Sequence, residues 1–176
     1  MKFERTRDYE LVREIITTPG IWEYVTDDFS PSRNEFRPTE HEGIWYILAG
    51  DNQNTLIGMW ALVPQNGACW EIHTYMLPGS GFSARRTAAR ELADFLFSTT
   101  QCRRIVTNVP EFNRAARIFA KAAGMIEFGI NPKSYLKNGV LFDQHLLGIS
   151  KPTDHPEVTR MSAIPAQETP RLQECA

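Results

Sequence analysis

The segment from residue 71 to residue 129 constrains the fold more than any other part of this sequence. It contains a strand, a glycine turn at residues 78–81, a long helix, a second strand and an alanine-rich helix after Asn113. A Gly124-Met125 step then leads into another strand. A glycine turn between a strand and a helix leaves backbone N–H groups facing outward, and this geometry suits a phosphate. The segment therefore predicts a sheet with crossover helices and a ligand that carries a pyrophosphate.

The composition is that of one globular domain without an overall preference for nucleic acid. The chain has 176 residues, and its 19 basic side chains nearly balance 21 acidic ones. The charge is uneven, because residues 79–124 hold eight basic and three acidic side chains. An anionic small ligand would explain this local excess, and two solvated helix faces are the alternative explanation.

Three features predict a soluble, cytoplasmic protein. Cys69, Cys102 and Cys175 are sparse and have no paired spacing, which favours a reducing compartment over a disulfide scaffold. Residues 1–9 are charged rather than apolar, so no signal peptide is expected. No run approaches the ~18–20 apolar residues that a membrane span needs, and no membrane partner is expected.

Hydrophobic periodicity and turn residues predict an α/β fold with a mixed (α+β) sheet. We expect strands at residues 2–6, 44–49, 55–63, 68–77, 103–109, 125–130 and 140–149, and helices capped by Asp8 and at residues 21–25, 83–99 and 113–123. The resulting order is β-α-α-β-β-β-α-β-α-β-β, in which the long helix connects an antiparallel meander to a parallel neighbour. Its predicted buried stripe is Ala88, Leu92, Phe95, Leu96 and Thr99.

A change of composition predicts the domain boundary. Residues 1–150 are expected to form the single domain. Residues 151–176 hold four of the eleven prolines and show no apolar periodicity. They are therefore expected to form a disordered, proline-containing tail.

Three local patterns accompany this order of elements. They are Pro78-Gly79-Ser80-Gly81-Phe82-Ser83-Ala84-Arg85-Arg86, then Asn113-Arg-Ala-Ala116 running to Gly124-Met125, and finally Gly129 through Asn138-Gly139 to Asp143. Together they resemble the GNAT superfamily of acetyl-CoA-dependent N-acetyltransferases, across about residues 1–150. The last pattern is similar to the final hairpin of the branch that acetylates ribosomal-protein N-termini. Other segments are most similar to small acetyltransferase-like proteins encoded by bacteriophages, namely His73 to Pro78, Phe97 to Pro110, and Asn113.

The resemblance implies that backbone N–H groups of the glycine turn and of the following helical turn hold the pyrophosphate of acetyl-CoA. Gly79 and Gly81 would permit close approach and positive φ. The implied cofactor-binding residues are Met76, Leu77, Gly79, Ser80, Gly81, Phe82, Ser83, Ala84, Arg85, Arg86 and Asn113. Asn113 has an alternative role as the N-cap of its helix. Pro78 and Phe82 depart from the family pattern, which has arginine or glutamine and glycine at the matching positions.

The strand at residues 68–77 carries the candidate catalytic residues. Strand alternation places Cys69, Glu71, His73 and Tyr75 on one face. Glu71 and His73 are the predicted base that deprotonates an ammonium group. The alternatives are an exposed strand carboxylate and a half-buried strand histidine. No fourth ligand accompanies Cys69, Glu71 and His73, so no metal site is expected.

The general acid is expected to differ from that of the family. Many family members have a tyrosine seven residues after the asparagine, where it reprotonates the departing thiolate. Ala120 occupies that position here. Tyr75 and Tyr135 are the candidates to replace it.

Two functions are consistent with these expectations. The first is acetyl transfer from acetyl-CoA to a primary amine, which is a protein N-terminus, a lysine, a polyamine or a small amine. The second is a catalytically degenerate phage structural or host-interaction protein that keeps the fold. The expected partners are the acyl donor and the amine, with a homodimer or a virion or host protein as further candidates. No nucleic-acid partner is expected, and the location is the bacterial host cytoplasm or the virion.

Overall fold

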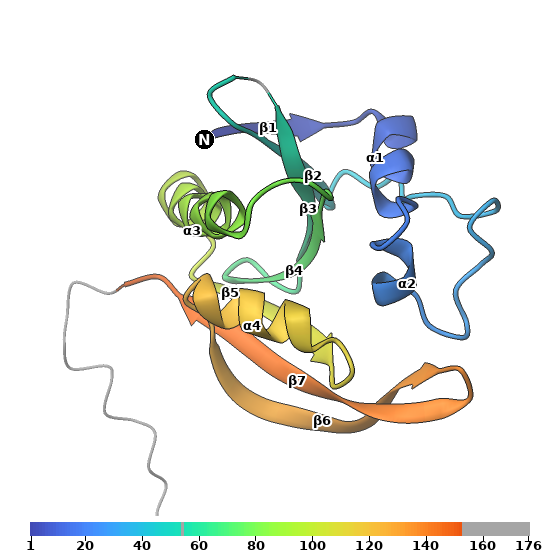
Figure 1. Cartoon of the computed structure of the whole chain (residues 1–176). Coiled ribbons are helices and arrows are strands. Elements are labelled where there is room, and N and C mark those ends of the chain that lie inside the picture. Colours follow the sequence, from blue (N-terminus) through green and yellow to red (C-terminus); the bar gives the residue numbers. More distant parts are fainter. Residues whose placement is uncertain (54, 153–176) are drawn as a thin grey trace, which may run out of the picture.

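The computed structural model describes residues 1–53 and 55–152. Within these residues seven strands form one sheet, in the order β1-β2-β3-β4-β5-β7-β6, and helices flank it (Figure 1). The elements are β1 (Lys2–Thr6), α1 (Tyr9–Ile16), α2 (Trp22–Val25), β2 (Trp45–Gly50), β3 (Leu56–Pro64), β4 (Cys69–Met76), α3 (Phe82–Thr99), β5 (Arg104–Pro110), α4 (Arg114–Ala122), β6 (Ile126–Lys137) and β7 (Val140–Ser150). The predicted fold class and order of elements are confirmed.

Helices cover both faces of the sheet. On one face α1 begins at its predicted cap, because Asp8 Oδ1 accepts a hydrogen bond from the Leu11 N–H at 3.0 Å. The apolar side of α1 packs with Tyr46, Met59 and Ala61 from β2 and β3. On the other face α3 packs on a separate set of buried residues, which includes Trp60, Leu62, Trp70 and Ile72.

α4 lies on the same face as α3, and two contacts connect the helices. The rings of Phe82 and Phe119 meet edge to face with centroids 6.3 Å apart. Arg90 of α3 donates a hydrogen bond to the Ala122 carbonyl oxygen at 3.0 Å. Figure 1 shows both helices together on the side of the molecule away from α1 and α2.

The buried stripe of α3 differs from the predicted one. Ala88, Leu92 and Leu96 are buried as expected, but the stripe continues through Ala93 and Phe97. Phe95 is 36% exposed and instead packs against Phe3, with the ring centroids 5.9 Å apart. Thr99 is exposed. The helix is therefore rotated, so that small Ala93 rather than bulky Phe95 faces the cleft described below.

β6 is longer than residues 125–130, where the sequence predicts it. It continues to Lys137 through an irregularity between Asn131 and Tyr135 in its pairing with β7. Lys133 has a φ of 49° there, and its N–H donates to Asp143 Oδ1 at 3.0 Å. Local sequence signals predict a break at this point, whereas cross-strand pairing restores the strand after the bulge.

The structure describes the C-terminal end of the domain as far as residue 152. Lys151 Nζ donates to the Phe97 carbonyl oxygen at 2.8 Å, so this residue still belongs to the folded part. The predicted disordered tail lies, from residue 153 onward, outside the described residues. No helix in the described part is long and apolar enough to span a membrane.

Candidate active site

A cleft opens where β4 and β5 separate. The two strands pair in parallel over three residue pairs, from Cys69↔Arg104 to Glu71↔Val106. Both strands then continue without pairing with each other. The cleft has a volume of about 710 Å³, which is in the usual range for small-molecule sites. Its lining includes residues of α3 and α4 on one face of the sheet and of the α1–α2 segment on the other. The cleft therefore passes through the sheet between the two strands.

The turn between β4 and α3 is fixed by its own side chains. Gly79 has a φ of 90°, a conformation that favours glycine. Arg85 reaches back from α3 and donates hydrogen bonds to the Leu77 carbonyl oxygen and to Ser80 Oγ, each at 2.8 Å. Ser80 Oγ donates to the same Leu77 oxygen at 2.8 Å. Arg85 is thus bound within the turn, while Arg86 is the exposed arginine next to it.

The start of α3 presents unpaired backbone N–H groups. Gly81, the N-cap, has no side chain to cap the helix, and no acceptor among the described residues reaches the N–H groups of Phe82, Ser83 and Ala84. A Cβ built on Gly79 or Gly81 would meet nothing within 4 Å, so the space in front of the turn is open. Positive φ was expected at both glycines, but Gly81 has a φ of −67° and is extended. The donors, the helix dipole and the open space fit a pyrophosphate.

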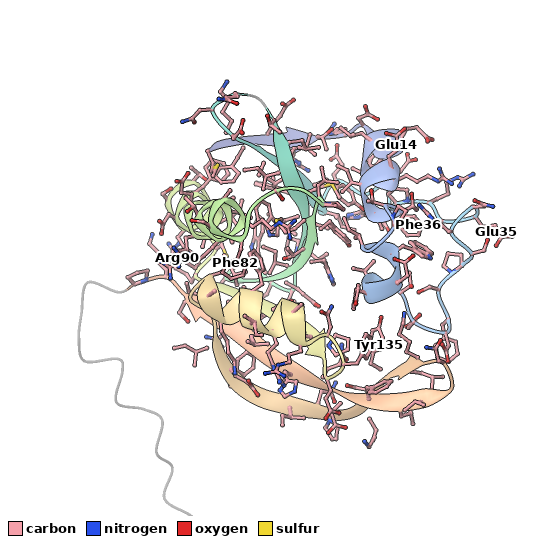
Figure 2. All side chains as sticks on the ribbon, viewed as in Figure 1. Glu14, Glu35, Phe36, Phe82, Arg90 and Tyr135 are labelled. Atoms are coloured by element: carbon pink, nitrogen blue, oxygen red, sulfur yellow. The ribbon has the colours of Figure 1, made fainter. Side chains whose placement is uncertain are left out.

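Residues of β4, α3 and α4 line the cleft beside this turn, whereas Gly79, Ser80 and Gly81 are not part of the lining. Met76 is partly buried at the end of β4, and Phe82 lies at the start of α3, facing α4 (Figure 2). Asn113 Oδ1 accepts from the Ala116 N–H at 3.1 Å, so this residue is the N-cap of α4 as its alternative role predicts. All three line the cleft. The Asn113 side-chain nitrogen Nδ2 has no partner among the described residues, and Asn113 remains a predicted cofactor contact.

Glu71 and His73 lie together inside the cleft. Glu71 Oε1 accepts a hydrogen bond from Asn108 Nδ2 at 3.3 Å, and Oε2 accepts one from Gln65 Nε2 at 3.2 Å. His73 Nε2 lies 3.7 Å from Glu71 Oε1. The side chain of Glu71 is 21% exposed and that of His73 is 47% exposed. This arrangement orients a carboxylate in the cleft and gives it a more solvent-accessible neighbour that can accept a proton.

Two of the three tyrosines that line the same cleft have raised pKa values. Tyr75 follows on the same face of β4 and packs with the α1 side of the core. Burial raises its pKa, and the nearby Tyr46 adds to this effect. Burial also raises the pKa of Tyr135 to about 12, and the charges of Asp27 and Asp28 contribute. Both phenols therefore keep their protons at neutral pH.

The α1–α2 face of the cleft is bounded by two segments that are held together. Asp28 accepts hydrogen bonds from the backbone N–H groups of Asn138 at 2.6 Å and Gly139 at 2.7 Å, which form the β6–β7 turn. Lys137 Nζ donates to the Thr26 carbonyl oxygen at 2.5 Å. We call this set of contacts the Asp28 clamp. It connects the segment after α2 to the hairpin tip, which Figure 1 shows beneath α2.

Several residues of the site are not predicted from the sequence. Asn108 and Gln65, which hold Glu71, come from β5 and from the turn before β4. The parallel register would have identified Asn108, because Val106 pairs with Glu71 and Asn108 follows two residues later. Tyr24, Val25 and Gln144 line the cleft without any local signal. Cys69 does not line it, and the described residues contain no group of three His, Cys, Asp or Glu side chains placed to hold a metal.

Comparison with known proteins identifies the fold. No protein-family model and no curated protein matches the sequence. Among solved structures, spermidine N-acetyltransferase from Vibrio cholerae in complex with CoA and spermine matches with a TM-score of 0.68 and 19% identity, over 85% of this chain and 94% of that one. Ribosomal-protein-S5-alanine acetyltransferase from Vibrio fischeri matches with a TM-score of 0.53 and 19% identity, over 62% of this chain and 63% of that one. The chain therefore has the GNAT fold of these N-acetyltransferases.

Proposed function

We propose that this chain transfers an acetyl group from acetyl-CoA to a primary amine. The observation that carries the proposal is one cleft, which is lined by Phe82 and Arg85 from the first turns of α3 and by Glu71 from β4. The GNAT fold is consistent with this activity, but the proposal rests on the site because one fold hosts many functions.

The chain supplies two kinds of group to the acyl donor. The N–H groups of Phe82, Ser83 and Ala84 would hold the pyrophosphate, since they are unpaired and face open space. Met76 and Asn113 would line the path toward the reacting end. Acetyl-CoA, when bound, supplies an acetyl group that is activated as a thioester.

Glu71 is the proposed base. It would accept a proton from the ammonium group of the acceptor, which frees the nitrogen lone pair. Asn108 and Gln65 hold the carboxylate in the cleft, and the more exposed His73 would pass the proton toward solvent. In the net reaction the amine nitrogen replaces sulfur on the acetyl carbon, and a thiol and one proton are released. Tyr75 or Tyr135 would act as a protonated hydrogen-bond donor near the departing sulfur.

The test is acetyl-CoA binding by the full chain and by two size-matched variants. We expect calorimetry and thermal shift to detect binding by the parent, because a ligand of the native state raises the melting temperature. Gly81→Asp should abolish binding by placing a carboxylate in front of the unpaired N–H groups. Gly81→Asn should weaken it less, because it has the same size without the charge. Both variants should fold, since Gly81 has an ordinary φ and open space around it.

Two outcomes would contradict the proposal. No binding by the parent at millimolar acetyl-CoA would favour a non-catalytic interaction protein with this fold. Equal binding by the parent and Gly81→Asp would show that the turn is not the phosphate site.

A further inference from the structure

The cleft contains little negative charge. Among the described residues that line it, Glu71 is the one carboxylate, and the basic or titratable nitrogen side chains are His73 and Arg85. Arg85 is engaged in the turn at the α3 end. The α1–α2 face lies opposite the helices α3 and α4 and is therefore the face left for an acceptor when the start of α3 holds the donor. On this face Glu71 is the one lining group that can pair with a cation.

Carboxylates just outside the lining are already used by the backbone. Both oxygens of Asp28 accept the turn N–H groups of the Asp28 clamp. Asp27 Oδ1 accepts from the Phe29 N–H at 3.1 Å and from Ser30 Oγ at 2.8 Å. Glu23 Oε2 accepts from the Gly20 N–H at 2.6 Å. The ammonium of Lys137 lies in the same region and offsets part of their charge.

The remaining wall on this face is apolar and aromatic. Ile21, Tyr24 and Val25 contribute from the α1–α2 segment, and Tyr135 contributes from β6. Tyr24 and Val25 remain partly open to solvent, with exposures of 50% and 38%. Such a surface is stabilised by contact with an apolar or aromatic group.

We infer that the acceptor is a primary amine with a single ammonium group on an uncharged, apolar body, and that polyamines are poor substrates. This inference rests on the proposed function and specifies its acceptor. A single ammonium pairs with Glu71 while its body covers Ile21, Tyr24 and Val25. A polyamine would bring further cations against this wall, whose lining holds no carboxylate besides Glu71 and whose neighbouring carboxylates already accept backbone N–H groups. A desolvated cation without a close partner is costly.

The experiment compares acceptors with the full chain at saturating acetyl-CoA. The acceptors are phenethylamine, a C-terminally amidated tetrapeptide with N-terminal phenylalanine and no charged side chain, and spermidine. We expect kcat/KM for phenethylamine or the tetrapeptide to exceed that for spermidine by roughly tenfold or more. A preference between the first two identifies the source of the amine as a small molecule or a peptide N-terminus, and either preference supports the inference.

A charge placed on the apolar wall provides an independent test. Val25→Asp adds a carboxylate at a partly exposed position, so it should raise the spermidine to phenethylamine ratio of kcat/KM by several-fold. Val25→Asn has the size of aspartate without the charge and should raise that ratio less, because it only removes apolar contact with phenethylamine. Circular dichroism checks that both variants fold.

The experiments distinguish failure of this inference from failure of the proposed function. If acetyl-CoA binds and spermidine is the better acceptor of the parent, the inference is wrong and the proposed function stands. If Val25→Asp and Val25→Asn change the acceptor ratio equally, charge at this wall does not select the acceptor and the inference is overturned. If acetyl-CoA does not bind, the proposed function fails and the inference fails with it.

Discussion

At the scale of single residues, the site depends on a carboxylate whose position is fixed by amides from two different segments. Glu71 is held by Asn108 of β5 and by Gln65 of the preceding turn. Because β4 and β5 have just separated at this point, the carboxylate lies at the inner end of the cleft. A substitution that removes the charge of Glu71 and keeps the shape of its side chain therefore distinguishes a catalytic role of this residue from a structural role.

We predict that Glu71→Gln lowers kcat by roughly 100-fold or more, as expected for loss of a general base. The affinity for acetyl-CoA should change little, because the turn at Gly79 and the start of α3 lie beyond the end of β4, several residues away from Glu71. Steady-state kinetics with calorimetry measure both quantities. Glu42→Gln removes a carboxylate that is exposed and pairs with Arg7, and it should behave like the parent. Unchanged turnover in Glu71→Gln would exclude Glu71 as the base.

At the scale of elements, much of the fold is predictable because its signals are local. Asp8 marks the start of α1 through its cap, and Gly79 marks the turn before α3 through its positive φ. β6 is predicted too short, because Pro132 and the bulge at Lys133 interrupt the local pattern that pairing with β7 restores. The stripe of α3 is misassigned at Phe95, because the surface of the sheet decides which side of a helix is buried.

The candidate site is less predictable from the sequence than the fold, because some of its residues come together only through tertiary structure. Glu71, His73 and Tyr75 follow from alternation within one strand, and the structure places all three along the cleft. Asn108 and Tyr24 reach the cleft through pairing register and helix placement, which no local pattern encodes. Sequence reasoning thus locates the strand that holds the candidate catalytic residues and misses the residues that other elements bring to the cleft.

The contact between α4 and the β6–β7 hairpin has a testable pH dependence. Glu127 of β6 has a pKa lowered to about 2, first by its hydrogen bond with Lys121 of α4 and then by that with His145 of β7. Its Oε2 lies 2.7 Å from Lys121 Nζ, and its Oε1 lies 2.7 Å from His145 Nδ1. His145 Nε2 in turn faces Arg117 of α4.

A carboxyl group with a lowered pKa stabilises the fold above its unfolded pKa, and the contribution is lost as the pH falls toward the folded pKa. The unfolded value for glutamate is 4.5, so the relevant window runs from there down to about 2. We predict that Glu127→Gln is less stable than the parent at pH 7, and that the difference narrows between pH 4 and pH 3. Urea unfolding at these pH values measures it. A difference that does not change with pH would show that the ion pair contributes nothing.

At the scale of the whole molecule, the sheet consists of two parts joined over a short length. β1 to β4 form one part and β5 to β7 the other, and three residue pairs between β4 and β5 connect them. On the α3 and α4 face the parts also meet through Phe82 and Phe119. On the opposite face the Asp28 clamp connects them (Figure 1). The two ends of the cleft are therefore bridged by different contacts.

We predict that the Asp28 clamp affects binding of the amine acceptor and does not affect binding of the acyl donor. Asp28→Ala should cost about 0.5–1.5 kcal/mol of stability, because two exposed N–H groups exchange a charged acceptor for water. It should also raise the KM for the amine several-fold, while the Kd for acetyl-CoA stays within about twofold. Asp51→Ala is the matched control, since Asp51 accepts from the N–H groups of Gln53 and Thr55 in a turn outside the cleft. If Asp28→Ala and Asp51→Ala changed the KM for the amine equally, a general loss of stability rather than the Asp28 clamp would explain the effect.

The spacing of the Asp28 clamp along the chain has a consequence for synthesis. Its partners are 110 and 111 positions apart in the sequence. The turn and helix start that would hold the acyl donor are complete much earlier, once α3 has been made. During translation, the wall that would receive the amine can close only after the β6–β7 turn leaves the ribosome. A nascent chain can thus complete the turn that is proposed to hold the phosphate before the wall that is proposed to receive the amine.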